Sequence, residues 1–100
     1  STAIVGCATM HAYLAYFAAV DGDMDHAAHH IRMSRRMYER IHSPYEQGVF
    51  YFILYTLAKE LQKKQAPFIT KPAAFYKMKC IELIENLQDN YLLNILKKTD

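Results

Sequence analysis

Apolar residues recur at helical spacing along almost the whole chain. The first apolar run begins near Ala8 and stops at Asp21-Gly22-Asp23. Steps of three and four residues mark one face of a helix, and a glycine between aspartates is typical of a helix end followed by a new start. We therefore predict a first helix over about 8–20, with the aspartates free to cap the next helix.

The second run predicts a helix over about 24–41. Its apolar face follows steps of four and three through Ala27, Ile31, Ser34, Tyr38 and Ile41. These steps fit one side of a 3.6-residue period. Because this face is narrow and begins with a small residue, we expect the first helix to approach it closely near Ala27.

A third helix is predicted from Ser43 to about Lys64. Ser43 precedes a proline and has Glu46 three residues further on, which is the pattern of a capping box. The apolar residues that follow wrap nearly all round the helix, which is typical of the most buried helix of a domain. Because few helices are present to cover the stretch from Val49 to Leu61, we expect it to associate with copies of the chain or with flanking helices.

The remaining residues predict a loop and then one or two helices. Two prolines place the loop over 65–72, with Phe68 and Ile69 packed back onto the core. The apolar stripe over 73–97 fits a single helix, whereas Gln88-Asp89-Asn90 could be a turn between two. We favour two helices, because Asp and Asn disfavour helix interiors. The sequence thus predicts an all-α domain of four to five helices that spans residues 1–100.

Composition narrows the class of protein. The 100 residues are 52% hydrophobic and 22% charged, as in ordered globular domains, and the net charge of +2 is too small to indicate nucleic-acid binding by itself. Cys7 and Cys80 lie in apolar segments without CxxC spacing, so we expect buried, reduced thiols in a cytoplasmic protein.

Two expectations concern the surroundings of the domain. No unbroken apolar run approaches the ~18 residues of a membrane span, so we expect no membrane segment. The chain starts Ser-Thr-Ala and enters an apolar stretch directly, and we therefore expect it to be a fragment of a longer chain.

The chain resembles the tetratricopeptide-repeat family. The resemblance is carried by a large-small pair, a Gly-Asp turn and small residues in the second helix: Leu14-Ala15, Gly22-Asp23, Ala27, Ile31 and Ser34. It covers roughly a third of the chain. The aromatic expected near His11 and the tyrosine expected at Ala18 are missing, and the closing proline expected at Glu39 comes only at Pro44.

The resemblance implies antiparallel helical hairpins that stack as a right-handed array with a binding groove. It places nine residues in that groove. Four of them are Thr9, Ala12, Ala19 and Gln62, and the five expected to bind a partner are Tyr13, Tyr16, Phe52, Tyr55 and Lys59. Tyrosine offers a large flat contact with little side-chain entropy to lose, and a lysine can meet a ligand carboxylate. We therefore expect a protein- or peptide-binding module, the interaction, dimerisation or effector domain of a larger intracellular regulator such as a transcription regulator. The plainer alternative is that these rings pack in the core.

A different class of function is indicated by a basic ridge. Arg32, Arg36 and Arg40, with His29, fall opposite the apolar stripe of the second helix. As an alternative to the repeat, a compact helical bundle could bind nucleic acid through these arginines. A solvated outer helix face explains them more simply.

Catalytic and metal-binding patterns are weak. Four residues with imidazole or thioether side chains lie along one flank of the second helix: His26, His30, Met33 and Met37. They could in principle bind copper, but methionines more often fill a helix seam and histidines beside Asp23 and Asp25 are more simply surface groups. No nucleophile lies in a catalytic context, so we expect no enzyme, no cofactor and no metal.

Overall fold

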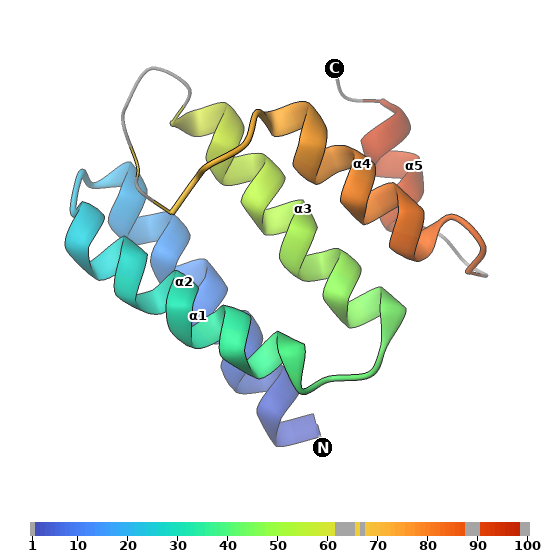
Figure 1. Cartoon of the computed structure of the whole chain (residues 1–100), viewed down its shortest axis with the longest axis horizontal. Coiled ribbons are helices and arrows are strands. Elements are labelled where there is room, and N and C mark those ends of the chain that lie inside the picture. Colours follow the sequence, from blue (N-terminus) through green and yellow to red (C-terminus); the bar gives the residue numbers. More distant parts are fainter. Residues whose placement is uncertain (1, 62–65, 67, 88–90, 99–100) are drawn as a thin grey trace.

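The computed structural model describes residues 2–61, 66, 68–87 and 91–98, and over these residues the protein is all-helical (Figure 1). Five helices follow one another without a strand in the described part of the chain: α1 (Thr2–Val20), α2 (Met24–Glu39), α3 (Pro44–Glu60), α4 (Ala73–Ile84) and α5 (Tyr91–Lys97). The all-α prediction is confirmed. Two helices, α4 and α5, lie within residues 73–97, as favoured from the sequence. The turn proposed at 88–90 lies outside the described residues.

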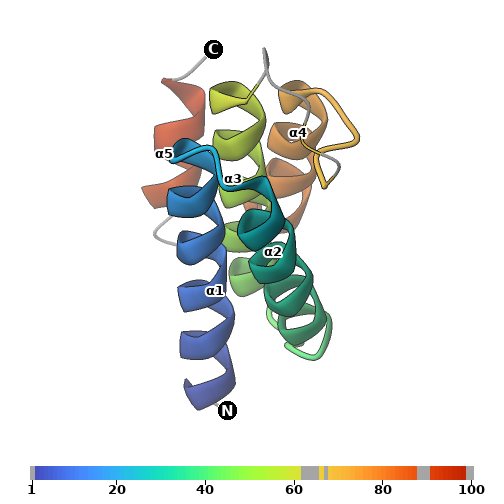
Figure 2. The same ribbon diagram turned by 90° about the vertical axis from the view of Figure 1, so that its left-hand side faces the viewer.

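The helices pack as adjacent pairs around α3. Contacts are most extensive between α1 and α2 and between α3 and α4, and α3 also touches both helices of the first pair. In Figure 2, α1 and α5 lie on one side and α2 and α4 on the other, with α3 between them. The central position predicted for α3 is therefore confirmed, whereas a tetratricopeptide-like array stays a prediction.

The turn between α1 and α2 shows why the first helix ends where it does. Gly22 has a φ of 85°, in the left-handed region that favours glycine. Its N–H donates to the carbonyl of Ala19, and the N–H of Asp23 donates to that of Ala18, at 3.0 and 2.8 Å. This pair of bonds is a Schellman motif, which satisfies carbonyls at the helix end. Asp23 then caps α2, because its carboxylate accepts from the His26 N–H at 3.2 Å.

Small residues bring α1 and α2 close together. The inner side of α1 consists of fully buried alanines: Ala8, Ala12, Ala15 and Ala19. Ala27 of α2 is also fully buried, as predicted. Ser34, buried between the two helices, donates from its hydroxyl to the Ala8 carbonyl at 2.8 Å. A polar group in such a dry seam is stabilised only when it is bonded, so this contact fixes the register of the pair.

The pair α3–α4 is equally close, around a glycine. A Cβ placed at Gly48 would collide with the Ile84 side chain, so α4 approaches α3 where α3 has no side chain. The Cys80 thiol, also buried, donates to the Gly48 carbonyl at 3.2 Å. At the start of α3, Ser43 accepts from the Glu46 N–H at 3.3 Å, which confirms the predicted cap.

One sequence expectation about α1 is wrong. Cys7 is exposed rather than buried. The segment Ala3–Val20 is also, by length and composition, long and apolar enough to cross a membrane, although core helices of soluble proteins and signal sequences share this property. Gly6, Thr9 and His11 interrupt the apolar run without making the segment polar on average, so the absence of a membrane segment stays a prediction. Only 22% of that segment is buried within the fold.

Candidate functional site

The most unusual surface of the molecule is the outer face of α1. Of the eight large hydrophobic residues that are exposed in the described chain, five lie there: Met10, Tyr13, Leu14, Phe17 and Val20. They occupy steps of three and four residues, so they share one side of the helix. Their exposed fractions run from 40% to 59%. Exposed apolar residues are ordinary when scattered, whereas these five lie together on one helix face, which makes that face a candidate interaction surface.

Charge is missing from the same helix. Between Thr2 and Val20 the sequence contains no Asp, Glu, Lys or Arg, and His11 is the one ionisable side chain other than the thiol and the two phenols. A helix that is apolar all round is normally buried on all sides. The extensive contacts of α1 are with α2 and α3, and its alanine side is buried, whereas the five large residues stay exposed.

The five groove residues predicted from the resemblance do not form one surface. Tyr13 is exposed and Tyr16 half-buried on α1, where the Tyr16 ring packs against Phe17 with centroids 5.7 Å apart. Tyr55 on α3 is only 3% exposed, which contradicts the expected accessible ring.

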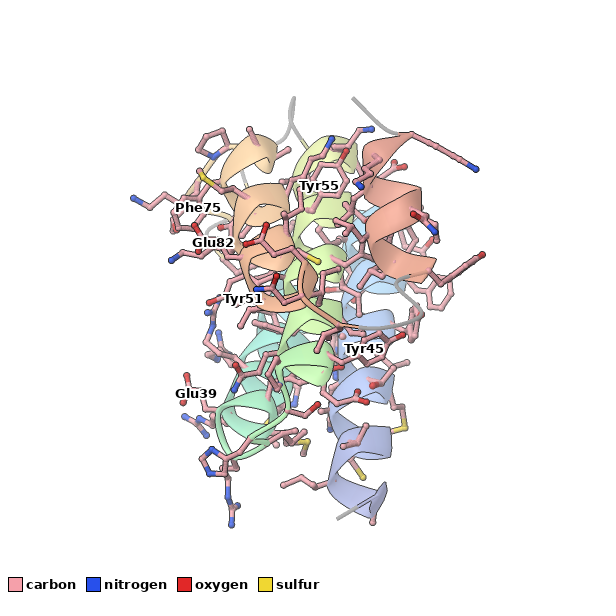
Figure 3. The ribbon with its side chains drawn as sticks, turned by 90° about the vertical axis from the view of Figure 1, so that its right-hand side faces the viewer. Glu39, Tyr45, Tyr51, Tyr55, Phe75 and Glu82 are labelled. Atoms are coloured by element: carbon pink, nitrogen blue, oxygen red, sulfur yellow. The ribbon has the colours of Figure 1, made fainter. Side chains whose placement is uncertain are left out.

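The three predicted residues of α3, Phe52, Tyr55 and Lys59, do come together. The half-buried Phe52 ring lies 6.3 Å from that of Tyr55, and the exposed Lys59 ammonium sits 5.4 Å above the Tyr55 ring. Figure 3 shows Tyr55 on the side of α3 that faces α4 and α5. These residues pack together in the C-terminal half of α3, and the lysine covers the Tyr55 ring through a cation–π contact.

The basic ridge lies where the sequence predicted it. Arg32, Arg36 and Arg40 are all exposed on α2, and none makes an ion pair within the part of the chain that the structure describes. Arg35, outside the ridge, instead lies over the Phe50 ring at 5.2 Å. Such stacking uses the flat guanidinium to cover an aromatic side chain.

Beside this stacked pair lies a cleft that sequence reasoning missed. Its volume is about 180 Å³, and its lining comes from α2 and α3: Arg35, Tyr38, Glu39, Gln47, Phe50 and Tyr51. In Figure 3, Glu39 and Tyr51 lie on the same side of the molecule. No motif in the sequence predicts the cleft, because its residues come from two helices that meet only after folding.

Two histidines of α2, His26 and His30, make different contacts. His26 pairs with Asp23 at 2.6 Å at the exposed turn, and the two hydrogen bonds from His26, first that of its backbone, lower the pKa of Asp23. His30 instead faces His11 of α1, with the two Nδ1 atoms 3.0 Å apart. Burial, and then the charge of His11, lowers the pKa of His30. One imidazole of the pair must be neutral to accept the bond.

Among the described residues, no three His, Cys, Asp or Glu side chains lie close enough to hold an ion.

Comparison with family models, with curated proteins and with solved structures finds no significant match for this chain. The geometry of the α1 outer face therefore carries the functional interpretation.

Proposed function

We propose that this chain is a non-enzymatic protein-interaction module, and that its docking surface is the outer face of α1. The observation that supports this is the row of five half-exposed large hydrophobic residues on a helix without a single Asp, Glu, Lys or Arg. Burying such a row contributes about 25 cal/mol per Å² of apolar surface. Of the tyrosines expected to bind a partner, Tyr13 belongs to this face, whereas the buried Tyr55 belongs to the core.

The wider role follows the resemblance. Helical-repeat modules of the tetratricopeptide type bind proteins or peptides, and we place this one in a larger intracellular regulator on that ground. The buried alanine seam behind α1, with its Ser34–Ala8 hydrogen bond, supports the proposal, because a docking helix must keep its position when a partner binds.

An apolar dye provides the test. At low micromolar protein concentration, 8-anilinonaphthalene-1-sulfonate should bind the native chain and become fluorescent. Met10→Lys should remove most of this signal, because it places a charge in the middle of the row. Met78→Lys is the matched control, since Met78 on α4 is 55% exposed and Met10 is 51% exposed. A signal that Met10→Lys leaves unchanged would refute the proposed surface.

A second candidate function rests on the ridge of Arg32, Arg36 and Arg40. The three guanidinium groups point to solvent without a carboxylate partner in the described chain, as a phosphate-binding surface requires. Nucleic-acid binding through this ridge should weaken steeply with salt and be lost on Arg36→Glu. Binding to a short DNA duplex that persists in Arg36→Glu would reject this candidate.

A further inference from the structure

We infer that the partner of the α1 outer face is a second copy of this chain, with the two α1 helices packed antiparallel about a two-fold axis. The inference rests on the proposed function, because it names the occupant of the same surface. Three features of the face support it: its order of residues, its lack of charge and its area.

The order of residues is self-complementary. A two-fold axis that passes between Tyr13 and Leu14 places each of these residues opposite the other one in the second copy. The same axis sets Met10 opposite Phe17 and Cys7 opposite Val20, and all of these residues are exposed. Each aromatic ring thus meets an aliphatic or thioether side chain, and sulfur–aromatic contacts are favourable. An isologous interface requires such pairing of a surface with itself.

The lack of charge favours a like partner. Two copies of α1 meet without repulsion, because neither carries an Asp, Glu, Lys or Arg. Homodimer interfaces are more apolar than other interfaces and are depleted of charge in their core. A partner with a charged rim would find no complementary group along this helix.

The area fits a weak dimer. If the five residues expose about half of roughly 150–250 Å² each, two copies bury about 750–1,250 Å² between them. Exposed Ala3, Gly6 and Cys7 extend the same side of the helix toward its start. Interfaces near the lower limit of about 1,000 Å² are weak, so we expect dissociation in the micromolar range.

A lipid surface is a less suitable occupant. Helices that lie on membranes carry Lys or Arg along the polar face that flanks the apolar one. The α1 helix has neither, and the side opposite its outer face is occupied by the alanine seam with α2 and by α3.

Sedimentation of the whole chain tests the dimer. The native chain and Met78→Lys should shift from monomer to dimer as the concentration rises through the micromolar range, whereas Met10→Lys should bind itself at least tenfold more weakly. The three chains should unfold at similar temperatures, because both methionines are about half exposed. Equal self-association of Met10→Lys and Met78→Lys would overturn the inference.

A cross-linking experiment tests the antiparallel geometry. With the axis between Tyr13 and Leu14, the two Cys7 thiols lie about 20 Å apart along the helices, because each residue adds about 1.5 Å. A short bifunctional maleimide should therefore join two chains of Val20→Cys, through Cys7 of one and the new thiol of the other. It should join neither the native chain nor Val20→Cys that also carries Cys7→Ser. Efficient cross-linking of the native chain would overturn the antiparallel packing.

The dye separates the failure of this inference from the failure of the proposed function. A chain that stays monomeric at high concentration, but still binds the dye through Met10, overturns the dimer and leaves α1 as a docking surface for something else. A monomer that binds phosphatidylcholine vesicles, and loses them on Met10→Lys, overturns the dimer in favour of a lipid surface. A monomer that binds no dye overturns both proposals.

Discussion

Two helices of this protein, α1 and α3, are apolar nearly all round, and they end in opposite situations. No residue of α3 from Glu46 to Ala58 is exposed, because α1, α2 and α4 cover it. On α1 the alanine side is buried, whereas the side with the larger residues faces solvent. The difference shows that an apolar pattern predicts the need for a partner and not where the partner comes from. For α3 the partners lie in the same chain, whereas the larger residues of α1 face solvent in the described structure.

A matched pair of leucines gives the largest test of this contrast. Leu54 on α3 is fully buried and Leu14 on α1 is 40% exposed. Leu54→Ala should lower the free energy of unfolding by about 2–5 kcal/mol, because it removes buried methyl groups and leaves a cavity. Leu14→Ala should change it by less than ~0.5 kcal/mol at low protein concentration. Urea unfolding measures both, and similar losses would show that α1 is covered in solution as α3 is.

The two cysteines report the same contrast by chemistry. Burial raises the pKa of Cys80 to about 11, and its thiol donates to the α3 backbone. Cys7 is exposed on α1. Because the thiolate is the reactive form, Cys7 should react with Ellman's reagent at pH 8 about a hundredfold faster or more than Cys80. The comparison uses Cys80→Ser and Cys7→Ser, each with one thiol. Equal rates in the folded proteins would contradict the placement of both helices.

A pair of glycines gives a smaller effect with opposite signs. A Cβ at Gly48 of α3 would meet Ile84, whereas a Cβ at Gly6 of α1 has nothing within 4 Å. Gly48→Ala should therefore destabilise by about 1–3 kcal/mol through overpacking. Gly6→Ala should stabilise by about 0.5–1 kcal/mol, because alanine loses less backbone entropy in a helix interior. Thermal unfolding tests both signs, and a neutral Gly48→Ala would show that α3 and α4 can separate at little cost.

Local features of the fold were readable from the sequence. Helix starts at Asp23 and Ser43 follow from short-range hydrogen bonds that depend only on neighbouring residues, and both caps were predicted correctly. Of the small residues in the α1–α2 seam, Ala27 was predicted correctly, because close packing requires a small residue there in a helical hairpin, whereas Ala12 and Ala19 were expected in the groove and are buried. The start of α1 was predicted too late: the helix begins at Thr2, whereas the apolar spacing was followed only from Ala8.

The candidate site was harder to predict, because it depends on which helix lies next to which. Tyr55 was expected in an open groove and is buried near α5, since the position of α5 could not be read from the pattern. Uncovered apolar residues were expected on α3. The fold instead covers α3 and leaves the large apolar residues of α1 exposed. His30 was read as a surface group and faces His11, which lies 19 residues away in the chain.

The histidine pair gives the smallest effect and tests how α1 is held to α2. Burial, then the charges of His11, His29 and His26, lowers the pKa of His30 below its ordinary 6.5. Between the lowered pKa and 6.5 the unfolded chain binds more protons at His30 than the folded chain does. The contribution of His30 to the free energy of unfolding should therefore be complete above pH 6.5 and be lost as the pH falls through the lowered pKa. The Asp23 carboxyl, whose pKa is lowered from 3.8, acts only at more acidic pH. Urea midpoints at pH 7.5 and 5.5 should differ less in His30→Gln than in the native chain, whereas His42→Gln, in the exposed connection after α2, should leave the difference unchanged. If both variants behave alike, the His11–His30 contact is not part of what holds the docking helix to the bundle.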